Sequence, residues 1–265
     1  MVKTSDFDAW SAGQSYEHYM GRWSRKIAEE FVDWIAPPAD SEWLEIGCGT
    51  GALTQTILSP AAPRSILATD QSADFVSHAA ADNRDSRARF AVANAVQIPV
   101  TDASVDVAVS ALVMNFISDK KLALAEMRRV LRPDGLLAFY VWDYPGRGMG
   151  FIDAFWKAAA EIDPSAAEMD EGARFPFCQK DGLAEICQDA AIVCTDIAAI
   201  EVETRFPDFE SFWHPFTLGA GPAPGYCSNL PEKRRQQLKE LLAAKLGEDG
   251  PITLPARAWA VKANV

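Results

Sequence analysis

Apolar residues follow two patterns that alternate through the first half of the chain. The first is a spacing of four residues, which places apolar side chains on one helix face and predicts a helix over residues 22–35. The second is a short continuous run rich in β-branched residues, which is typical of a strand buried on both faces. Such runs predict strands at 43–46, 65–69, 88–93, 105–110 and 136–142.

Helical segments lie between these strands, and capping residues mark where some of them start. One helix is expected near residues 51–58, another after the N-cap residue Ser72, and another after Asp119. Two further strands are expected near 195–203 and 256–262. This alternation predicts an α/β protein with a doubly wound, mostly parallel sheet of seven strands.

Two long insertions break the alternation after residue 144, and they are expected to cover the ligand edge of the sheet. The expected segments are a helical lead-in over the ligand (1–40), a Rossmann-like core (41–144), a first insertion (145–192), a core strand (193–204), a second insertion (205–253) and a final core strand (254–265). Residues 142–226 hold 13 of the 27 aromatic residues. This enrichment predicts that the insertions form a small core of their own, with an aromatic-lined substrate pocket as the alternative.

Composition and charge limit the possible partners. The 265 residues are 49% apolar and carry a net charge of −12. An acidic surface repels phosphate backbones and anionic lipids, so neither nucleic acid nor a membrane is expected as a partner. No apolar run reaches transmembrane length, and residues 1–11 lack the apolar segment of a secretory leader. A cytoplasmic location is therefore expected.

The cysteines argue against a metal site. They number five, and no pair has the spacing of a zinc ligand set. An odd number without paired spacing is typical of a reduced compartment. No metal is therefore expected.

The most distinctive segment is the turn after the first predicted strand, where Gly47, Gly49 and Gly51 follow Glu45. Glycine takes positive φ angles and lets a ligand approach the backbone closely. The spacing also fits a dinucleotide fingerprint, with Asp70 placed for a ribose, so an NAD(P)-dependent oxidoreductase is an alternative. A carboxylate such as Glu45 at the turn suits a cationic ligand better than a pyrophosphate.

Several polar or small residues are expected to share one edge of the sheet. Residues 47–51, Asp70, Asn94, Ala111 and Asp143 lie at or just after predicted strand ends. The carboxyl ends of parallel strands meet at the same edge, which is where open α/β sheets bind ligands. The sequence thus predicts one ligand site built from several strand ends.

Four segments in order resemble motifs of the class I S-adenosylmethionine-dependent methyltransferases, of the small-molecule, menaquinone-methyltransferase-like type. They are residues 45–51, Asp70 at the end of the second strand, residues 104–109 in the fourth strand and residues 131–137 at the turn into the fifth. The lead-in segment at residues 16–23 is also similar to the segment that often folds over the cofactor in this family. The resemblance implies S-adenosyl-L-methionine as cofactor and S-adenosyl-L-homocysteine as product.

The resemblance also implies which residues bind the cofactor. They are Tyr16, Tyr19, Glu45, Gly47, Cys48, Gly49, Gly51, Asp70, Gln71, Asn94, Ala95 and Ala111. Asp70 is expected to hold both ribose hydroxyls. Asn94 stands where the family usually has Asp beside the adenine, and its amide oxygen can still accept from the adenine amino group. Loss of the charge would weaken that bond by about 1 kcal/mol.

Methyl transfer from a sulfonium needs mainly an aligned acceptor and a dry site, so a general base is optional. His214 is the candidate proton acceptor, with a packed or surface histidine as the alternative. Candidate residues of the substrate pocket are Asn115, Trp142, Tyr144 and Trp213. Core packing is the alternative for Trp142.

The expected activity is methyl transfer from S-adenosylmethionine to a small-molecule acceptor by direct in-line displacement. Two alternatives remain open from the sequence. One is a catalytically silent regulatory subunit that binds S-adenosylmethionine, and the other is the NAD(P)-dependent oxidoreductase.

Overall fold

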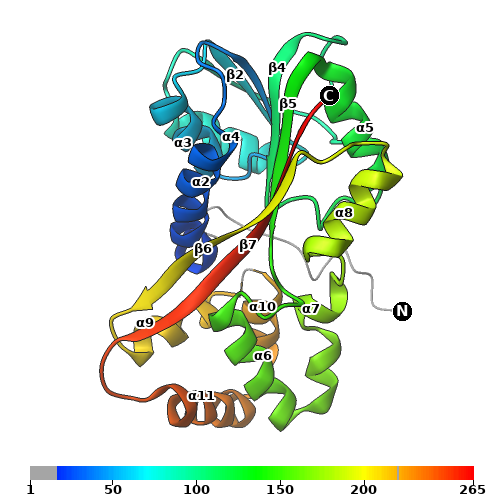
Figure 1. Cartoon of the computed structure of the whole chain (residues 1–265). Coiled ribbons are helices and arrows are strands. Elements are labelled where there is room, and N and C mark those ends of the chain that lie inside the picture. Colours follow the sequence, from blue (N-terminus) through cyan, green and yellow to red (C-terminus); the bar gives the residue numbers. More distant parts are fainter. Residues whose placement is uncertain (1–16, 220) are drawn as a thin grey trace. The chain divides into compact units, whose positions relative to one another are not determined.

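The computed structural model describes residues 17–219 and 221–265 (Figure 1). These residues form two compact units, which are described separately. The sheet unit comprises residues 24–142, 177–200 and 258–265. The helical unit comprises residues 17–23, 143–176 and 201–257, without residue 220.

Seven strands form one sheet, as the apolar runs predict. They are β1 (Glu42–Ile46), β2 (Ser65–Asp70), β3 (Ala88–Val92), β4 (Val105–Ala111), β5 (Leu131–Trp142), β6 (Asp196–Phe206) and β7 (Ile252–Asn264). Their order is β3-β2-β1-β4-β5-β7-β6. Strands β1 to β5 pair in parallel, and β7 pairs antiparallel with β5. The prediction of a mostly parallel, seven-stranded α/β sheet is confirmed.

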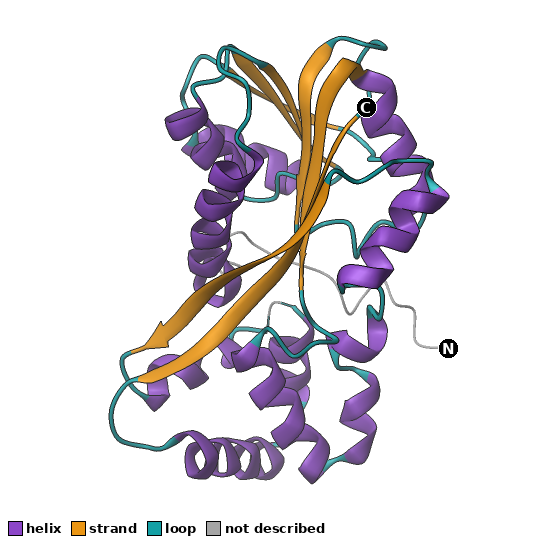
Figure 2. Cartoon of the chain, in the orientation of Figure 1, coloured by secondary structure: helices purple, strands orange, loops and turns teal. Residues whose placement is uncertain are grey.

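Helices cover both faces of the sheet in the sheet unit. They are α2 (Arg22–Ile35), α3 (Ala52–Thr56) with the π-helical turn η2 (Ile57–Ala61), α4 (Ala73–Asp82), α5 (Lys120–Val130) and α8 (Lys180–Asp189). Figure 2 shows α2, α3 and α4 on one side of the strands and α5 and α8 on the other. Ser72 caps α4 by accepting from Phe75 N, and Asp119 caps α5 by accepting from Leu122 N, so both predicted caps are confirmed.

Strand β5 begins five residues earlier than expected. Val105 pairs with Leu131 and Val107 pairs with Leu136, so the residues between Leu131 and Leu136 form a bulge rather than a turn before the strand. Asp134 has a φ of +66°, which turns the chain outward and returns it to the strand. The turn residues were recognised, but the pairing of Leu131 across the bulge is a long-range contact that the local pattern does not show.

The central strands are buried along almost their full length, which explains their continuous apolar character. Leu44, Ala108 and Phe139 are each 0% exposed. Helix α2 contributes Phe31, whose ring centroid lies 4.6 Å from that of Tyr140 on β5. The core of the sheet unit therefore fixes the register of the strands and, with it, the positions of the residues that follow them.

The helical unit has an aromatic core of its own. Its elements are η1 (Glu17–Gly21), α6 (Gly150–Ile162), η3 (Pro164–Glu168), α7 (Glu171–Arg174), α9 (Phe209–Trp213), η4 (His214–Thr217), α10 (Pro222–Asn229) and α11 (Glu232–Leu246). Phe155 and Phe216 stack at 4.5 Å, and Phe151 lies 5.9 Å from Phe206. All four rings are buried. The aromatic enrichment is thus explained by packing.

The first insertion is shorter than expected. Residues 145–192 were expected to belong together, whereas residues 177–200 group with the sheet unit. The reason is that α8 packs along α5, where Arg128 Nη1 donates to Ala191 O at 3.2 Å. The lead-in is divided as well, because residues 17–23 group with the helical unit and α2 continues in the sheet unit from Ser24.

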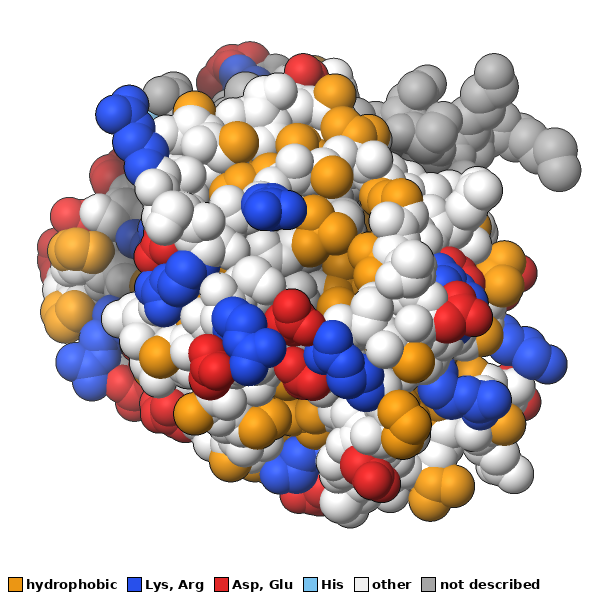
Figure 3. Space-filling model, turned by 90° about the horizontal axis from the view of Figure 1, so that it is seen from above, with side chains coloured by type: hydrophobic (Ala, Val, Ile, Leu, Met, Phe, Trp, Pro, Cys, Tyr) orange, Lys and Arg blue, Asp and Glu red, His pale blue; other side chains and the backbone are white. Residues whose placement is uncertain are grey.

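The amino-terminal edge of the parallel strands carries charged side chains of both signs. Arg132 pairs with Glu42 at 2.6 Å and with Asp106 at 2.7 Å. Figure 3 views the molecule from this side and shows basic and acidic side chains interspersed. Asp106 also accepts from Glu42 N at 2.8 Å, so these contacts give Asp106 a structural role in β4. In the described part of the chain, no helix is long and apolar enough to cross a membrane.

Candidate cofactor site

The glycine turn between β1 and α3 is held against the end of β2. Gly47 N and Cys48 N both donate to Thr69 O, at 2.7 and 2.9 Å. Gly47, Gly49 and Gly51 have φ angles of +73°, +53° and +87°. The turn therefore needs glycine for its backbone conformation, as the sequence predicted.

Two of these glycines differ in what surrounds them. A Cβ atom at Gly47 would lie 2.4 to 2.8 Å from side-chain atoms of Val113, so this position has no room for a side chain. A Cβ at Gly49 would meet none of the described residues within 4 Å. Gly47 is thus required for packing below the turn, whereas Gly49 faces space in which a ligand can approach the backbone.

Asp70 connects the glycine turn to the start of α4. Its Oδ2 accepts from Gly49 N at 3.0 Å, and its Oδ1 accepts from Ser72 N at 2.9 Å. The N-cap of α4 is Ser72, so Asp70 does not serve as that cap. Each carboxylate oxygen keeps a further lone pair, which suits a pair of ligand hydroxyl groups.

Glu45 lies beneath the turn and is buried. It is 1% exposed, and its Oε2 accepts from Thr54 Oγ1 at 2.5 Å. Burial raises the pKa of Glu45 to about 7, the Thr54 hydrogen bond opposes this rise, and the negative charge of Asp70 adds to it. Glu45 therefore titrates near neutral pH, where a bound cation would favour its ionised form.

Cys48 fills space within the turn. It packs against Ala68 and Ala79 and is 5% exposed. Burial raises the pKa of its thiol far above the usual range, and the charges of Glu45 and Asp70 add to the rise. A thiol that stays protonated is a poor nucleophile, so Cys48 has a packing role.

Asn94 and Ala95 begin the loop after β3. Asn94 Oδ1 accepts from Val96 N at 3.1 Å, and Asn94 O accepts from Gln97 N at 3.0 Å. The side-chain oxygen that was expected to accept from adenine thus already stabilises a local turn. Asn94 is exposed, and its amide oxygen keeps a second lone pair that a ligand can still use.

The end of β4 supplies the next candidates. Ala111 is its last residue and is half-buried, and Asn115 follows in the loop with 6% exposure. Asn115 Nδ2 has no hydrogen-bond partner among the described residues. Gln71, after β2, is exposed. The sheet therefore brings the candidates after β1, β2, β3 and β4 to one edge, as parallel pairing requires.

The remaining candidates are divided between the units. Trp142 ends β5, where it is 2% exposed and pairs with Ala258, so it packs in the sheet unit. Tyr19 and Trp213 are buried in the helical unit. Burial and the charge of Glu171 raise the pKa of Tyr19.

Tyr144 and His214 also belong to the helical unit, whereas Tyr16 lies outside the described residues. The ring of Tyr144 lies 6.1 Å from that of Phe175. His214 is exposed at the junction of α9 and η4. Exposure favours the surface alternative for His214, and its role as proton acceptor stays a prediction.

Asp143, expected at the ligand edge, is engaged within the helical unit. It is 1% exposed, and its carboxylate accepts from Arg257 Nε at 2.6 Å and from Gly146 N at 2.8 Å. Arg257 also donates to Glu201 at 3.2 Å. These contacts neutralise Asp143 and bind together three segments that are far apart in the sequence.

Three residues near the site were not recognised from the sequence. Thr54 donates to Glu45, Val113 packs against Gly47, and Arg129 binds the loop after β3. For Arg129, the sequence offered a signal in Glu126, three residues earlier on the same helix, because that spacing favours an ion pair. Thr54 and Val113 have no comparable signal, since only the folded contact reveals them.

Comparison with known proteins agrees with this geometry. A family model described as a methyltransferase domain matches residues 44–139. A malonyl-acyl-carrier-protein O-methyltransferase of Hahella chejuensis is 27% identical over 51% of this chain and 48% of its own length. The human thiol S-methyltransferase TMT1A is 30% identical over 57% of this chain and 61% of its own length. The chain thus spans about half to three fifths of these relatives.

The fold has counterparts among solved structures. A geranyl diphosphate methyltransferase in complex with S-adenosylmethionine superposes with a TM-score of 0.53 and 15% identity, over 96% of this chain and 91% of that one. At this identity the likeness shows the fold alone. The family match over residues 44–139 includes the glycine turn, Asp70 and Asn94, so this part of the chain is similar to a methyltransferase domain.

Proposed function

We propose that the chain transfers a methyl group from S-adenosylmethionine to a small-molecule acceptor, leaving S-adenosylhomocysteine. The observation that carries this proposal is the turn at Gly49, which faces open space beside the Asp70 carboxylate. Asp70 would bind the ribose hydroxyls. The bound cofactor supplies an electrophilic methyl group, and the acceptor supplies the electron pair for the new bond.

The carboxylates around the turn favour a cationic cofactor over a dinucleotide. Glu45 lies directly below the turn, and Asp70 accepts from its backbone at Gly49 N. A pyrophosphate at the same turn would be repelled by Asp70 and by the ionised form of Glu45. A sulfonium would instead be attracted by them, which supports S-adenosylmethionine over NAD(P).

The relatives suggest where to search for the acceptor. One is named for transfer to oxygen on a carrier-bound malonyl group, and the other for transfer to a thiol. We therefore place carboxylic acids and thiols first in an acceptor screen, followed by phenols and amines. Formation of S-adenosylhomocysteine with any of them distinguishes the enzyme from a silent cofactor-binding subunit.

The cofactor is tested by calorimetric titration with S-adenosylhomocysteine, with NADH as the control. Binding of S-adenosylhomocysteine without binding of NADH supports the proposal. Binding of NADH alone contradicts it and makes Asp70 a ribose ligand of a dinucleotide.

Gly49→Val tests the site itself, and Gly247→Val is its matched control. Both glycines have positive φ angles, +53° and +91°, and a Cβ at either meets no described residue within 4 Å. Both substitutions place a β-branched residue at a positive φ angle and therefore strain the backbone. Only Gly49→Val should abolish binding of S-adenosylhomocysteine. Equal retention of binding in both variants would refute the assignment of the turn.

Asp70→Ala is the second test, with Asp74→Ala as its control. Asp74 lies four residues later, in the exposed first turn of α4. We expect loss of cofactor binding for Asp70→Ala alone. Both proteins should remain folded by circular dichroism.

A further inference from the structure

The loop between β3 and β4 is bound by two side chains of α5, Arg129 and Glu126. Its residues, 93–104, include Asn94 and Ala95, and the regular strand pairing ends before them at Val92. Within the loop, Asn94 and Gln97 form an isolated bridge. Further hydrogen bonds within the loop are short-range, such as that from Val100 N to Ile98 O, and contacts with neighbouring elements hold the loop to the rest of the fold.

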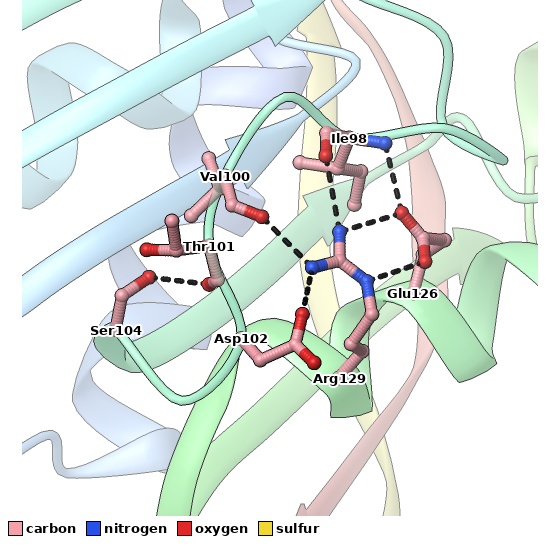
Figure 4. A network of polar contacts seen from close by, with 7 residues as sticks. All are labelled: Ile98, Val100, Thr101, Asp102, Ser104, Glu126 and Arg129. Atoms are coloured by element: carbon pink, nitrogen blue, oxygen red, sulfur yellow. Dashed lines mark hydrogen bonds and ion pairs between the residues drawn. The ribbon is translucent and has the colours of Figure 1, made fainter.

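Arg129 makes these contacts with every donor that it has. Its Nη1 donates to Val100 O at 2.8 Å and to Asp102 Oδ1 at 2.6 Å, and its Nη2 donates to Ile98 O at 3.0 Å. The remaining two donors bind Glu126, from Nε at 2.6 Å and from Nη2 at 2.8 Å. A guanidinium has five N–H groups, so all five are used (Figure 4).

Glu126 completes the arrangement from the same helix. Its Oε2 accepts from Ile98 N at 2.9 Å, so both backbone polar groups of Ile98 are bound by the pair of Glu126 and Arg129. The Arg129 hydrogen bond and charge lower the pKa of Glu126, which keeps the carboxylate ionised near neutral pH. We call Arg129 and Glu126 the loop clamp.

The clamp lies next to the turn at Asn94. Ile98 is one residue beyond Gln97, whose N donates to Asn94 O, and two beyond Val96, whose N donates to Asn94 Oδ1. The position of Asn94 and Ala95 therefore depends on where the clamp holds Ile98. Without the clamp, the loop would adopt other conformations in part of the molecules. Ligand affinity falls in proportion to the fraction of molecules whose loop has the binding-competent conformation.

We propose that Arg129 is a positioning residue for cofactor binding, which acts by holding the loop that carries Asn94 and Ala95. This inference rests on the proposed function, because it assigns the loop to the adenine side of S-adenosylmethionine. Lysine can replace arginine here only in part, since an ammonium has three donors and no planar fork.

The first measurement compares hydrogen exchange in the ligand-free wild type, Arg129→Gln and Arg128→Gln. Arg128 is the matched control, because it is the adjacent arginine and donates to Ala191 O outside the loop. We expect faster exchange of the amides of Val96, Gln97 and Ile98 in Arg129→Gln alone. Unchanged exchange would overturn the clamp, whatever the cofactor is.

The second measurement is the affinity of the same proteins for S-adenosylhomocysteine and for S-inosylhomocysteine, which differs only in the base. We expect Arg129→Gln to weaken S-adenosylhomocysteine binding about ten-fold and to bring the ratio of the two dissociation constants closer to one. Arg129→Lys should give an intermediate loss and serves in place of Arg129→Gln if that variant does not fold. Arg128→Gln should bind like the wild type.

The outcomes separate this inference from the proposed function. A lower unfolding temperature with unchanged affinity and unchanged base preference would show a merely structural role and refute the positioning role. Equal affinity of the wild type for both ligands would refute the assignment of the loop to the base. A wild type that does not bind S-adenosylhomocysteine overturns the proposed function and the positioning role together, whereas the exchange data still show whether Arg129 orders the loop.

Discussion

The burial of Glu45 predicts that this residue releases a proton when a positively charged cofactor binds. Its pKa is raised to about 7 by burial, so about half of the molecules carry a proton on Glu45 at pH 7. A positive charge bound at the turn favours the ionised carboxylate and should lower this pKa by about 1 to 3 units. Binding of S-adenosylmethionine should therefore release a proton from Glu45.

The expected number of protons released depends on pH. If binding lowers the pKa from about 7 to about 5, release is about 0.8 proton at pH 6, about 0.5 at pH 7 and about 0.1 at pH 8. S-adenosylhomocysteine lacks the sulfonium charge and should release less at each pH. The difference between the two ligands isolates the sulfonium, because the rest of the molecule is shared.

Calorimetry in buffers of different ionisation enthalpy measures the number of protons released. Glu45→Gln cannot ionise and should abolish the difference between the two ligands. Glu171→Gln is the matched control, because Glu171 is also buried and burial raises its pKa to about 7 as well. Equal release by both ligands in the wild type, or release that disappears in Glu171→Gln instead, would refute the role of Glu45.

The same shift predicts how stability depends on pH. The folded protein holds the proton of Glu45 more tightly than the unfolded chain, whose pKa is near 4.5. The stabilisation is fully present below about pH 4.5 and is lost as the pH rises through 7, with a total of about 3 kcal/mol. Urea unfolding at pH 5 and pH 8 should show this loss in the wild type and a smaller one in Glu45→Gln.

Two further substitutions test single contacts. Arg257→Met should lower the free energy of unfolding by about 3 to 5 kcal/mol, because it leaves the buried Asp143 carboxylate without its cation. Adding Asp143→Asn should recover part of this loss. A cost below about 1 kcal/mol in urea unfolding would contradict the reasoning. His214→Gln should leave kcat little changed because His214 is exposed. A loss of about ten-fold or more, with unchanged affinity for S-adenosylhomocysteine, would instead assign the proton-acceptor role to His214.

Local patterns in the sequence were sufficient for the presence of the seven strands, the helix caps and the glycine turn. The positive φ angles at Gly47, Gly49 and Gly51 follow from the residue type, and the edge that they share with Asp70 follows from parallel pairing. Contacts between distant segments were not predictable in this way. The bulge in β5 and the packing of α8 on α5 depend on partners that no local window contains.

Three acidic residues near strand ends show why residue type alone does not define the site. Glu45 is buried against Thr54, and its pKa is raised to about 7. Asp143 is neutralised by Arg257. Asp70 is held by two backbone amides and remains half-buried. Among the described residues, its carboxylate has neither the cationic partner of Asp143 nor the burial of Glu45, so it keeps lone pairs available to ligand hydroxyls. The partners of each carboxylate, rather than its position at a strand end, therefore make Asp70 the candidate for ribose binding, which stays a prediction.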